Sequence, residues 1–140
     1  MNDAVLWSRR RLLAVLALAA CIGCAWDPVG EGGRVKMVRT ELYFGRSMPG
    51  GARVSDTQWA AFVADHVTPR FRDGLTVLDA KGQWLDKSGK LVREDTKVVI
   101  LIHVGTMAED IAIHNIISAY KREFRQEAVL RVSQRAGVSF

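Results

Sequence analysis

The sequence predicts an α+β domain over residues 37–140, with a ferredoxin-like split βαβ (βαββαβ) arrangement: a four-stranded antiparallel sheet with two helices on one face. Two observations predict it. Four segments of strand-like alternation are interrupted by two segments with apolar residues at helical spacing, and each helical segment opens on a capping box. Because the order is strand, helix, strand, strand, helix, strand, right-handed crossovers place both helices on the same side of the sheet.

The first predicted strand covers residues 38–45, and the first predicted helix lies between Ser55 and Pro69. Alternation puts Thr40, Leu42 and Phe44 on one face of the strand, and Arg39, Glu41 and Tyr43 on the other. The capping box Ser55-Asp56-Thr57-Gln58 begins the helix, and Pro69 ends it. The apolar stripe of this helix consists of Trp59, Phe62, Val63, His66 and Val67.

The second half of the domain starts with a strand over residues 75–80, and the turn signal at 86–89 joins it to a strand over 97–104. In that strand we expect Val98, Ile100, Ile102 and Val104 on one face, and Lys97, Val99, Leu101 and His103 on the other. Thr106-Met107-Ala108-Glu109 caps the second helix, whose stripe is Ile113, Ile116, Ile117, Tyr120 and Phe124. A last strand over 129–133 is expected to point Leu130 and Val132 inward and Arg131 outward.

The N-terminal segment has the pattern of a signal peptide. Three arginines at positions 9–11 precede a short apolar run, 12–20, which is too short for a membrane-spanning helix of about 20 residues. Leu18-Ala19-Ala20-Cys21 resembles a lipobox, so we predict cleavage before Cys21 and acylation of its thiol and amine. An ordinary signal peptide cut near Cys24 or Ala25 is the alternative interpretation.

The sequence therefore divides into a signal peptide (1–20), a lipid attachment site with a glycine-rich tether (21–36) and one domain (37–140). Ser8-Arg9-Arg10-Arg11-Leu12-Leu13 also fits a twin-arginine export signal, although arginines are equally typical of general secretory signals. We expect an exported bacterial lipoprotein facing the periplasm or the cell exterior. Ile22 after Cys21 lacks the aspartate of inner-membrane retention and favours the outer membrane where the host has one.

Charge and cysteine content narrow the chemistry. Removing residues 1–20 takes three arginines and one aspartate from 20 basic and 15 acidic residues, so the net charge falls from +5 to about +3. This balance does not indicate a nucleic-acid partner. Both cysteines, Cys21 and Cys24, precede the domain, which excludes disulfides, thiolate nucleophiles and cysteine-bound metals from it.

Several segments, in order, resemble the bacterial family called domain of unknown function 3574, whose members are often described as lipoproteins. The segments are Thr40-Glu41-Leu42-Tyr43-Phe44-Gly45, Thr68-Pro69-Arg70-Phe71, Asp73-Gly74-Leu75-Thr76-Val77-Leu78, Gly82-Gln83-Trp84 and Val129-Leu130-Arg131-Val132. The resemblance covers residues 37–140 and departs from the family at Arg72, where proline is expected. It implies a small exported or lipid-anchored domain, and it brings no catalytic residues.

The open face of the sheet is the candidate binding surface. We expect it to carry Arg39, Glu41, Tyr43, Lys97, His103 and Arg131. Three interpretations stay open: a solvated, ion-paired face, a face that binds a ligand or a second copy, and an active site. Arg70 is a further candidate because its planar fork suits carboxylate or phosphate, although its loop also fits a simple turn. Trp84 is a candidate stacking contact near the hairpin tip, or a cross-strand packing residue.

No catalytic motif and no cofactor motif stands out, and His66, His103 and His114 lack the spacing of metal ligands. Our first functional hypothesis is a lipid-anchored envelope module that binds or assembles, with a membrane contact through its anchor and a homodimer or envelope protein as partner. The alternative is a small exported enzyme whose acid–base residues are Glu41, Tyr43 or His103 on the same face.

Overall fold

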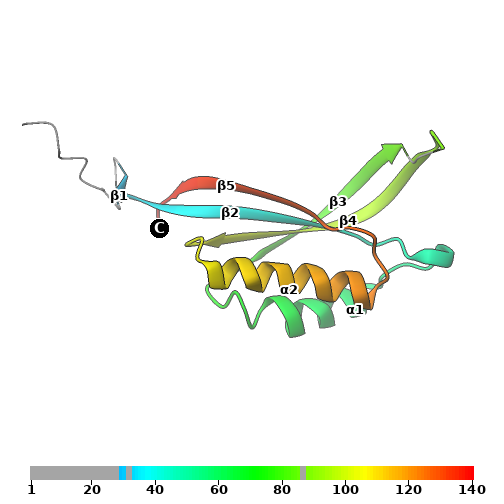
Figure 1. The fold of residues 1–140 in the computed structure, drawn as a ribbon, viewed down its shortest axis with the longest axis horizontal. Coiled ribbons are helices and arrows are strands. Elements are labelled where there is room, and N and C mark those ends of the chain that lie inside the picture. Colours follow the sequence, from blue (N-terminus) through cyan, green and yellow to red (C-terminus); the bar gives the residue numbers. More distant parts are fainter. Residues whose placement is uncertain (1–28, 31–32, 86–87) are drawn as a thin grey trace, which may run out of the picture.

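The computed structural model describes residues 29–30, 33–85 and 88–140, which form a sheet with two helices against one face (Figure 1). The predicted lipidation site Cys21 and part of the predicted turn at 86–89 lie outside the described residues. The elements are β1 (Val29–Gly30), β2 (Arg34–Gly45), a short 3₁₀ turn (Pro49–Gly51), α1 (Asp56–Phe62), a π-helical turn (Val63–Val67), β3 (Thr76–Leu85), β4 (Leu91–His103), α2 (Met107–Glu123) and β5 (Leu130–Val138).

The four long strands have the order β3-β4-β2-β5, and every pairing between them is antiparallel. The two-residue β1 pairs with the start of β2. The first and third long strands, β2 and β4, therefore occupy the centre of the sheet, as a split βαβ arrangement requires. The predicted α+β class and ferredoxin-like fold are confirmed.

The strands are longer than their side-chain patterns predicted. β2 begins at Arg34 because its first residues pair with β5, where Val35 lies opposite Val138. β3 and β4 continue to Leu85 and from Leu91, which lie opposite each other near the hairpin tip. Backbone pairing, which does not depend on alternation, sustains these extensions. The β3–β4 hairpin consequently projects beyond the helices (Figure 1).

Both helices begin where their capping boxes predict. Ser55 Oγ accepts the backbone N–H of Gln58 at 3.1 Å, and Gln58 Oε1 accepts the N–H of Ser55 at 2.9 Å. Thr106 and Glu109 make the same reciprocal pair at α2. The first helix changes to a π-helical turn at Val63, and Thr68 then donates its N–H to the carbonyl of Val63. Val67, the last residue of this turn, is buried and lies two residues before Pro69.

The core lies between the helices and one face of the sheet. Phe44 of β2 is its centre: its ring centroid lies 4.7 Å from Tyr120, 5.3 Å from Trp59 and 5.9 Å from Phe62. Leu42, Val99 and Leu101 complete the sheet side of the core. The buried positions of α2 are Ile113, Ile116, Ala119 and Tyr120, so most of the predicted stripe is confirmed, and Ile117 packs at its margin.

The residues of β4 divide between its two faces as predicted, but the face of Lys97 and His103, expected on the open side of the sheet, was assigned to the wrong side. Leu42 lies opposite Val99 and Thr40 lies opposite Leu101, so Val99, Leu101 and His103 point toward the helices and are buried. Val98, Ile100 and Ile102 lie on the open face instead. Directly paired residues share a face, but this register cannot be inferred from a strand that is apolar on both sides.

The predicted facing of β5 was also wrong. Arg131 lies opposite Leu42, on the helix side, where its Nη2 pairs with Asp110 Oδ1 of α2 at 2.7 Å. Leu130 and Val132 lie opposite Tyr43 and Glu41, so they belong to the open face, where they are 59% and 43% exposed. The ion pair with α2 compensates for placing a cation on the core side of the sheet.

Candidate functional site

The open face carries a row of three polar residues along β2. Glu41 Oε1 accepts a hydrogen bond from Arg39 Nε at 2.9 Å, and Glu41 Oε2 accepts one from the Tyr43 hydroxyl at 2.5 Å. The Tyr43 hydrogen bond, helped by Arg39 and opposed by burial, lowers the pKa of Glu41, and the same bond raises the pKa of Tyr43. At neutral pH the row thus consists of a carboxylate with both oxygens satisfied, a neutral phenol and a guanidinium.

Apolar side chains flank this polar row on both sides. Leu130 and Val132 lie on β5, Ile100 and Ile102 lie on β4, and Leu78 lies on β3. Val98 of β4 points to the same face but is only 5% exposed. Leu78 is 49% exposed and Ile102 is 37% exposed. Trp84 shares this face farther out on the hairpin. Its side chain is 46% exposed, so it lies at the surface and not in the core. The open face is therefore a broad apolar surface with a polar centre.

The six residues of the predicted binding face are divided between the two sides of the sheet. Arg39, Glu41 and Tyr43 share the open face, whereas Lys97, His103 and Arg131 lie on the helix side. The single-face grouping was therefore wrong. Arg70 lies in an exposed turn and donates through Nη1 to the carbonyl of His66 at 2.7 Å, which gives it a structural contact.

His103 is buried beside the N-terminus of α2. Its Nε2 lies 2.9 Å from the hydroxyl of Thr40, which lies 2.9 Å from the hydroxyl of Ser133. Its Nδ1 lacks a hydrogen-bond partner among the described residues and lies 3.6 Å from Glu109 Oε2. His103 is 5% exposed and Thr40 is fully buried, so these hydrogen bonds connect β2, β4 and β5 within the interior.

The hydrogen bonds of Glu109 make the stability of the α2 N-terminus sensitive to acid. Desolvation raises its pKa, but hydrogen bonds from Thr106, Val104 and Gly105 outweigh this and lower the pKa to about 2. A lowered pKa means that this stabilisation is complete above pH 4.5 and is lost as the pH falls toward 2. We expect Glu109→Gln to lower the free energy of unfolding at pH 7 by about 1–2 kcal/mol relative to the wild type. At pH 3 the difference between the two proteins should be smaller, and urea unfolding at both pH values measures it. An equal loss at both pH values would contradict this assignment.

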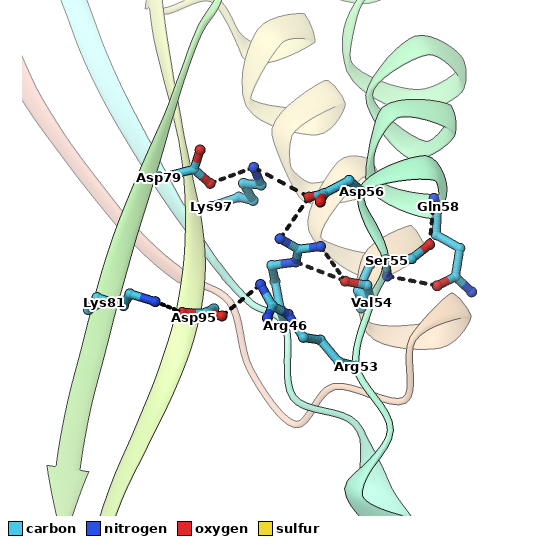
Figure 2. A network of polar contacts seen from close by, with 10 residues as sticks. All are labelled: Arg46, Arg53, Val54, Ser55, Asp56, Gln58, Asp79, Lys81, Asp95 and Lys97. Carbon is cyan, nitrogen blue, oxygen red and sulfur yellow. Dashed lines mark hydrogen bonds and ion pairs between the residues drawn. The ribbon is translucent and has the colours of Figure 1, made fainter.

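A second site lies on the helix side of the sheet, where the β3–β4 hairpin begins (Figure 2). We call it the charged network, and its charged residues are Arg46, Arg53, Asp56, Asp79, Lys81, Asp95 and Lys97. Arg46 is only 4% exposed and donates through Nε and Nη2 to the Val54 carbonyl at 2.8 and 2.6 Å. Its Nη1 lies 2.9 Å from Asp56 Oδ1. Lys97 pairs with Asp79 at 2.5 Å and approaches Asp56 at 3.8 Å. The hydrogen bond from Lys97, against an opposing contribution from burial, lowers the pKa of Asp79.

The outer part of the charged network centres on Asp95. Lys81, directly opposite on β3, pairs with one carboxylate oxygen, and Arg53 Nη2 lies 2.6 Å from the other (Figure 2). The Lys81 hydrogen bond, against burial and with help from Arg53, lowers the pKa of Asp95. An open cleft of about 600 Å³ lies beside it, between the hairpin and residues 46–53. The lining side chains are Arg46, Ser47, Arg53, Lys81, Gln83, Arg93, Glu94 and Asp95, with the backbone of Gly82.

Sequence reasoning did not identify this cleft. Its residues come from the loop after β2, from β3 and from β4, and they meet because Lys81 pairs with Asp95 across the hairpin. The one available signal was the number of basic residues that follow Gly45, because Arg46 and Arg53 bracket a glycine-rich turn.

Metal chemistry has no support in residues 29–30, 33–85 and 88–140, where no three histidine, cysteine, aspartate or glutamate side chains converge. His66 stacks on Phe62, with ring centroids 4.9 Å apart, and lies 3.7 Å from Glu123. Across the same residues, the helices are too short or too polar to cross a bilayer.

The fold and these two surfaces define a small ferredoxin-like domain with a partly apolar open sheet face. The chain belongs to the family described as protein of unknown function (DUF3574), whose model matches residues 39–140. This confirms the family resemblance. No curated protein matches the chain.

Solved structures with a similar fold include a phage SAM lyase in complex with S-methyl-5'-thioadenosine. It has a TM-score of 0.55 and 15% identity, and the alignment covers 82% of this chain and 95% of the lyase chain. The phage SAM lyase in its apo state also has a TM-score of 0.55, with 19% identity over 74% of this chain and 83% of the other. At these identities the likeness concerns the fold.

Proposed function

We propose that this chain is an exported, lipid-anchored envelope module that assembles with a second copy of itself through the open sheet face. The observation that carries the proposal is the exposed apolar surface around a polar row whose charges are already paired within β2. Monomeric proteins seldom leave a large contiguous apolar surface in water. The anchor at Cys21 rests on the signal-peptide pattern of the sequence.

The polar row supports a second copy as the occupant. Burying a charge is costly unless it is paired and hydrogen-bonded, and Glu41 enters an interface with both carboxylate oxygens already bonded. Arg39 keeps a side chain that is 40% exposed. In a two-fold arrangement each copy presents the same surface to the other, so Arg39 of one copy can approach Glu41 of its partner. The face is complementary to itself in charge as well as in polarity.

Native mass spectrometry of the exported protein in detergent tests this proposal. We expect a dimer whose subunit mass includes the lipid on Cys21. Ile102→Lys and Val132→Lys should each weaken the dimer at least about tenfold, because an unpaired ammonium would be buried in the interface. Ile111→Lys is the matched control, since Ile111 is 54% exposed on α2.

Two results would contradict the proposal. One is a wild-type protein that stays monomeric at a concentration of tens of micromolar, because a dimer with a Kd in the micromolar range would form at that concentration. The other is a dimer that both open-face variants leave intact. A subunit mass without lipid would refute the anchor separately from the assembly.

An enzyme acting on the same face is the second candidate function. The 2.5 Å hydrogen bond between Tyr43 and Glu41 and the fold shared with a SAM lyase favour it. Two clefts of the described residues lie at the charged network, and neither is lined by Glu41 or Tyr43. The enzyme hypothesis therefore has less structural support than the assembly hypothesis. If the wild type binds S-methyl-5'-thioadenosine and Glu41→Gln does not, the enzyme hypothesis becomes the better supported of the two.

A further inference from the structure

Beyond the proposed assembly, we infer that the cleft at the base of the β3–β4 hairpin binds a phosphate dianion, free or as the phosphate monoester of a small molecule. Four of its lining residues, Lys81, Gln83, Arg93 and Asp95, lie at helix-side positions of the hairpin, whereas Gly82 and Glu94 lie at open-face positions. None of the lining residues belongs to the apolar surface proposed for assembly. The cleft volume of about 600 Å³ lies within the range of small-molecule sites.

The charge of the lining favours an anion. Arg46 is paired with Asp56, but three other basic residues, Arg53, Lys81 and Arg93, face two acidic ones, Glu94 and Asp95, which leaves an excess of one positive charge in the lining. One carboxylate, Asp95, serves two of the cations, Lys81 and Arg53. The excess positive charge favours an anionic ligand over a neutral or cationic one.

Each acidic residue in the lining is already held by contacts within the protein. Glu94 Oε1 accepts the backbone N–H of Ser47 at 2.7 Å, and its carboxylate packs so closely on Gly45 that an added Cβ there would lie 2.6 Å from both oxygens. Asp95 is fixed between Lys81 and Arg53. These contacts orient the loop and the hairpin on either side of the cleft.

The cations that face the cleft keep donor capacity. Lys81 is 84% exposed and Arg53 is 54% exposed at the side chain, so both reach solvent beside Asp95. Arg93 donates through Nε to the neutral Gln83 Oε1 at 3.1 Å, which orients its guanidinium without neutralising it. Guanidinium forks bind phosphate with two parallel hydrogen bonds, and lysine adds a point charge. Arg46 is committed to Val54 and Asp56 and supplies the rigid floor.

Isothermal titration of the exported protein in neutral detergent with inorganic phosphate tests the inference. We expect saturable binding. Arg93→Gln should raise the Kd about tenfold, since it removes one charge-assisted contact. Asp95→Asn should lower the Kd, because it removes the anion nearest the ligand and releases Lys81 and Arg53. Arg122→Gln, the same change on α2, is the matched control for net charge and should have no effect.

A second arm separates a free phosphate or monoester from a lipid headgroup. Glycerol 3-phosphate is a monoester dianion, whereas glycerophosphoglycerol is the diester monoanion of a lipid headgroup. The inference predicts tighter binding of the monoester. Absent phosphate binding, equal losses in Arg93→Gln and Arg122→Gln, or preference for the diester would each overturn it. Circular dichroism confirms folding of each variant, and the dimer measurement reports independently on the proposed assembly.

Discussion

Replacing Phe44 by alanine is expected to lower the free energy of unfolding by about 3–5 kcal/mol, the largest loss from a single change in this domain. Phe44 is fully buried, and its ring contacts Trp59, Phe62 and Tyr120, which come from both helices. The cavity left by the ring would separate β2 from both helices at once. Neighbouring aromatic rings are too stiff to fill it, so little of the loss is recovered.

Urea unfolding followed by tryptophan fluorescence measures this loss, with Phe140→Ala as the matched control. Phe140 is fully exposed at the C-terminus, so the same substitution there should change stability by less than about 0.5 kcal/mol. An unchanged slope against urea concentration would show that the variant unfolds as the same cooperative unit. A loss below about 1 kcal/mol at Phe44 would show that the core is not organised around this ring.

Replacing Arg46 by methionine is expected to cost about 2–4 kcal/mol, the second largest effect. Methionine fills similar space but removes both hydrogen bonds to the Val54 carbonyl. Hydrogen bonds from a charged donor contribute about 1.5–3 kcal/mol, and a buried carbonyl left unpaired adds its desolvation penalty. The ion pair with Asp56 contributes little of this, because the Asp56 side chain is 82% exposed.

Arg53→Met separates these contributions. Arg53 is 54% exposed and pairs with Asp95 at the surface, so its loss should cost less than about 1 kcal/mol and should shrink in high salt. The Arg46→Met loss should persist in 0.5 M salt, a concentration at which surface pairs are strongly screened. Similar losses for both arginines, or a salt-sensitive loss at Arg46, would contradict a role for Arg46 as the buried support of the cleft.

Local signals predicted the elements well because their causes are local. Ser55 with Gln58 and Thr106 with Glu109 bond to backbone groups only three residues away, so the helix starts follow from sequence. Alternation along β2 was equally informative, since one face is apolar and the other polar. β4 is apolar on both faces, and its orientation depends on the partners that it meets across β2. The position of His103 under α2 therefore needed the register.

The candidate sites divide in the same way. Arg39, Glu41 and Tyr43 lie two residues apart on one strand, so their shared face was predictable. The cleft joins Arg53, Lys81 and Arg93 from three separate segments. No spacing along the chain encodes their proximity, because it results from strand pairing between β3 and β4 and from the path of the loop after β2.

The sequence alone thus determined the order of elements, the helix caps, the family and the polar row on β2, all of which depend on neighbours close along the chain. Only the tertiary structure decided which face of β4 and β5 meets the helices, and only it revealed the cleft at the hairpin base. The physical reason is that strand register sets these features. Register is chosen by packing of the whole core around Phe44, and shifting it by one residue would move every side chain of a strand to the opposite face.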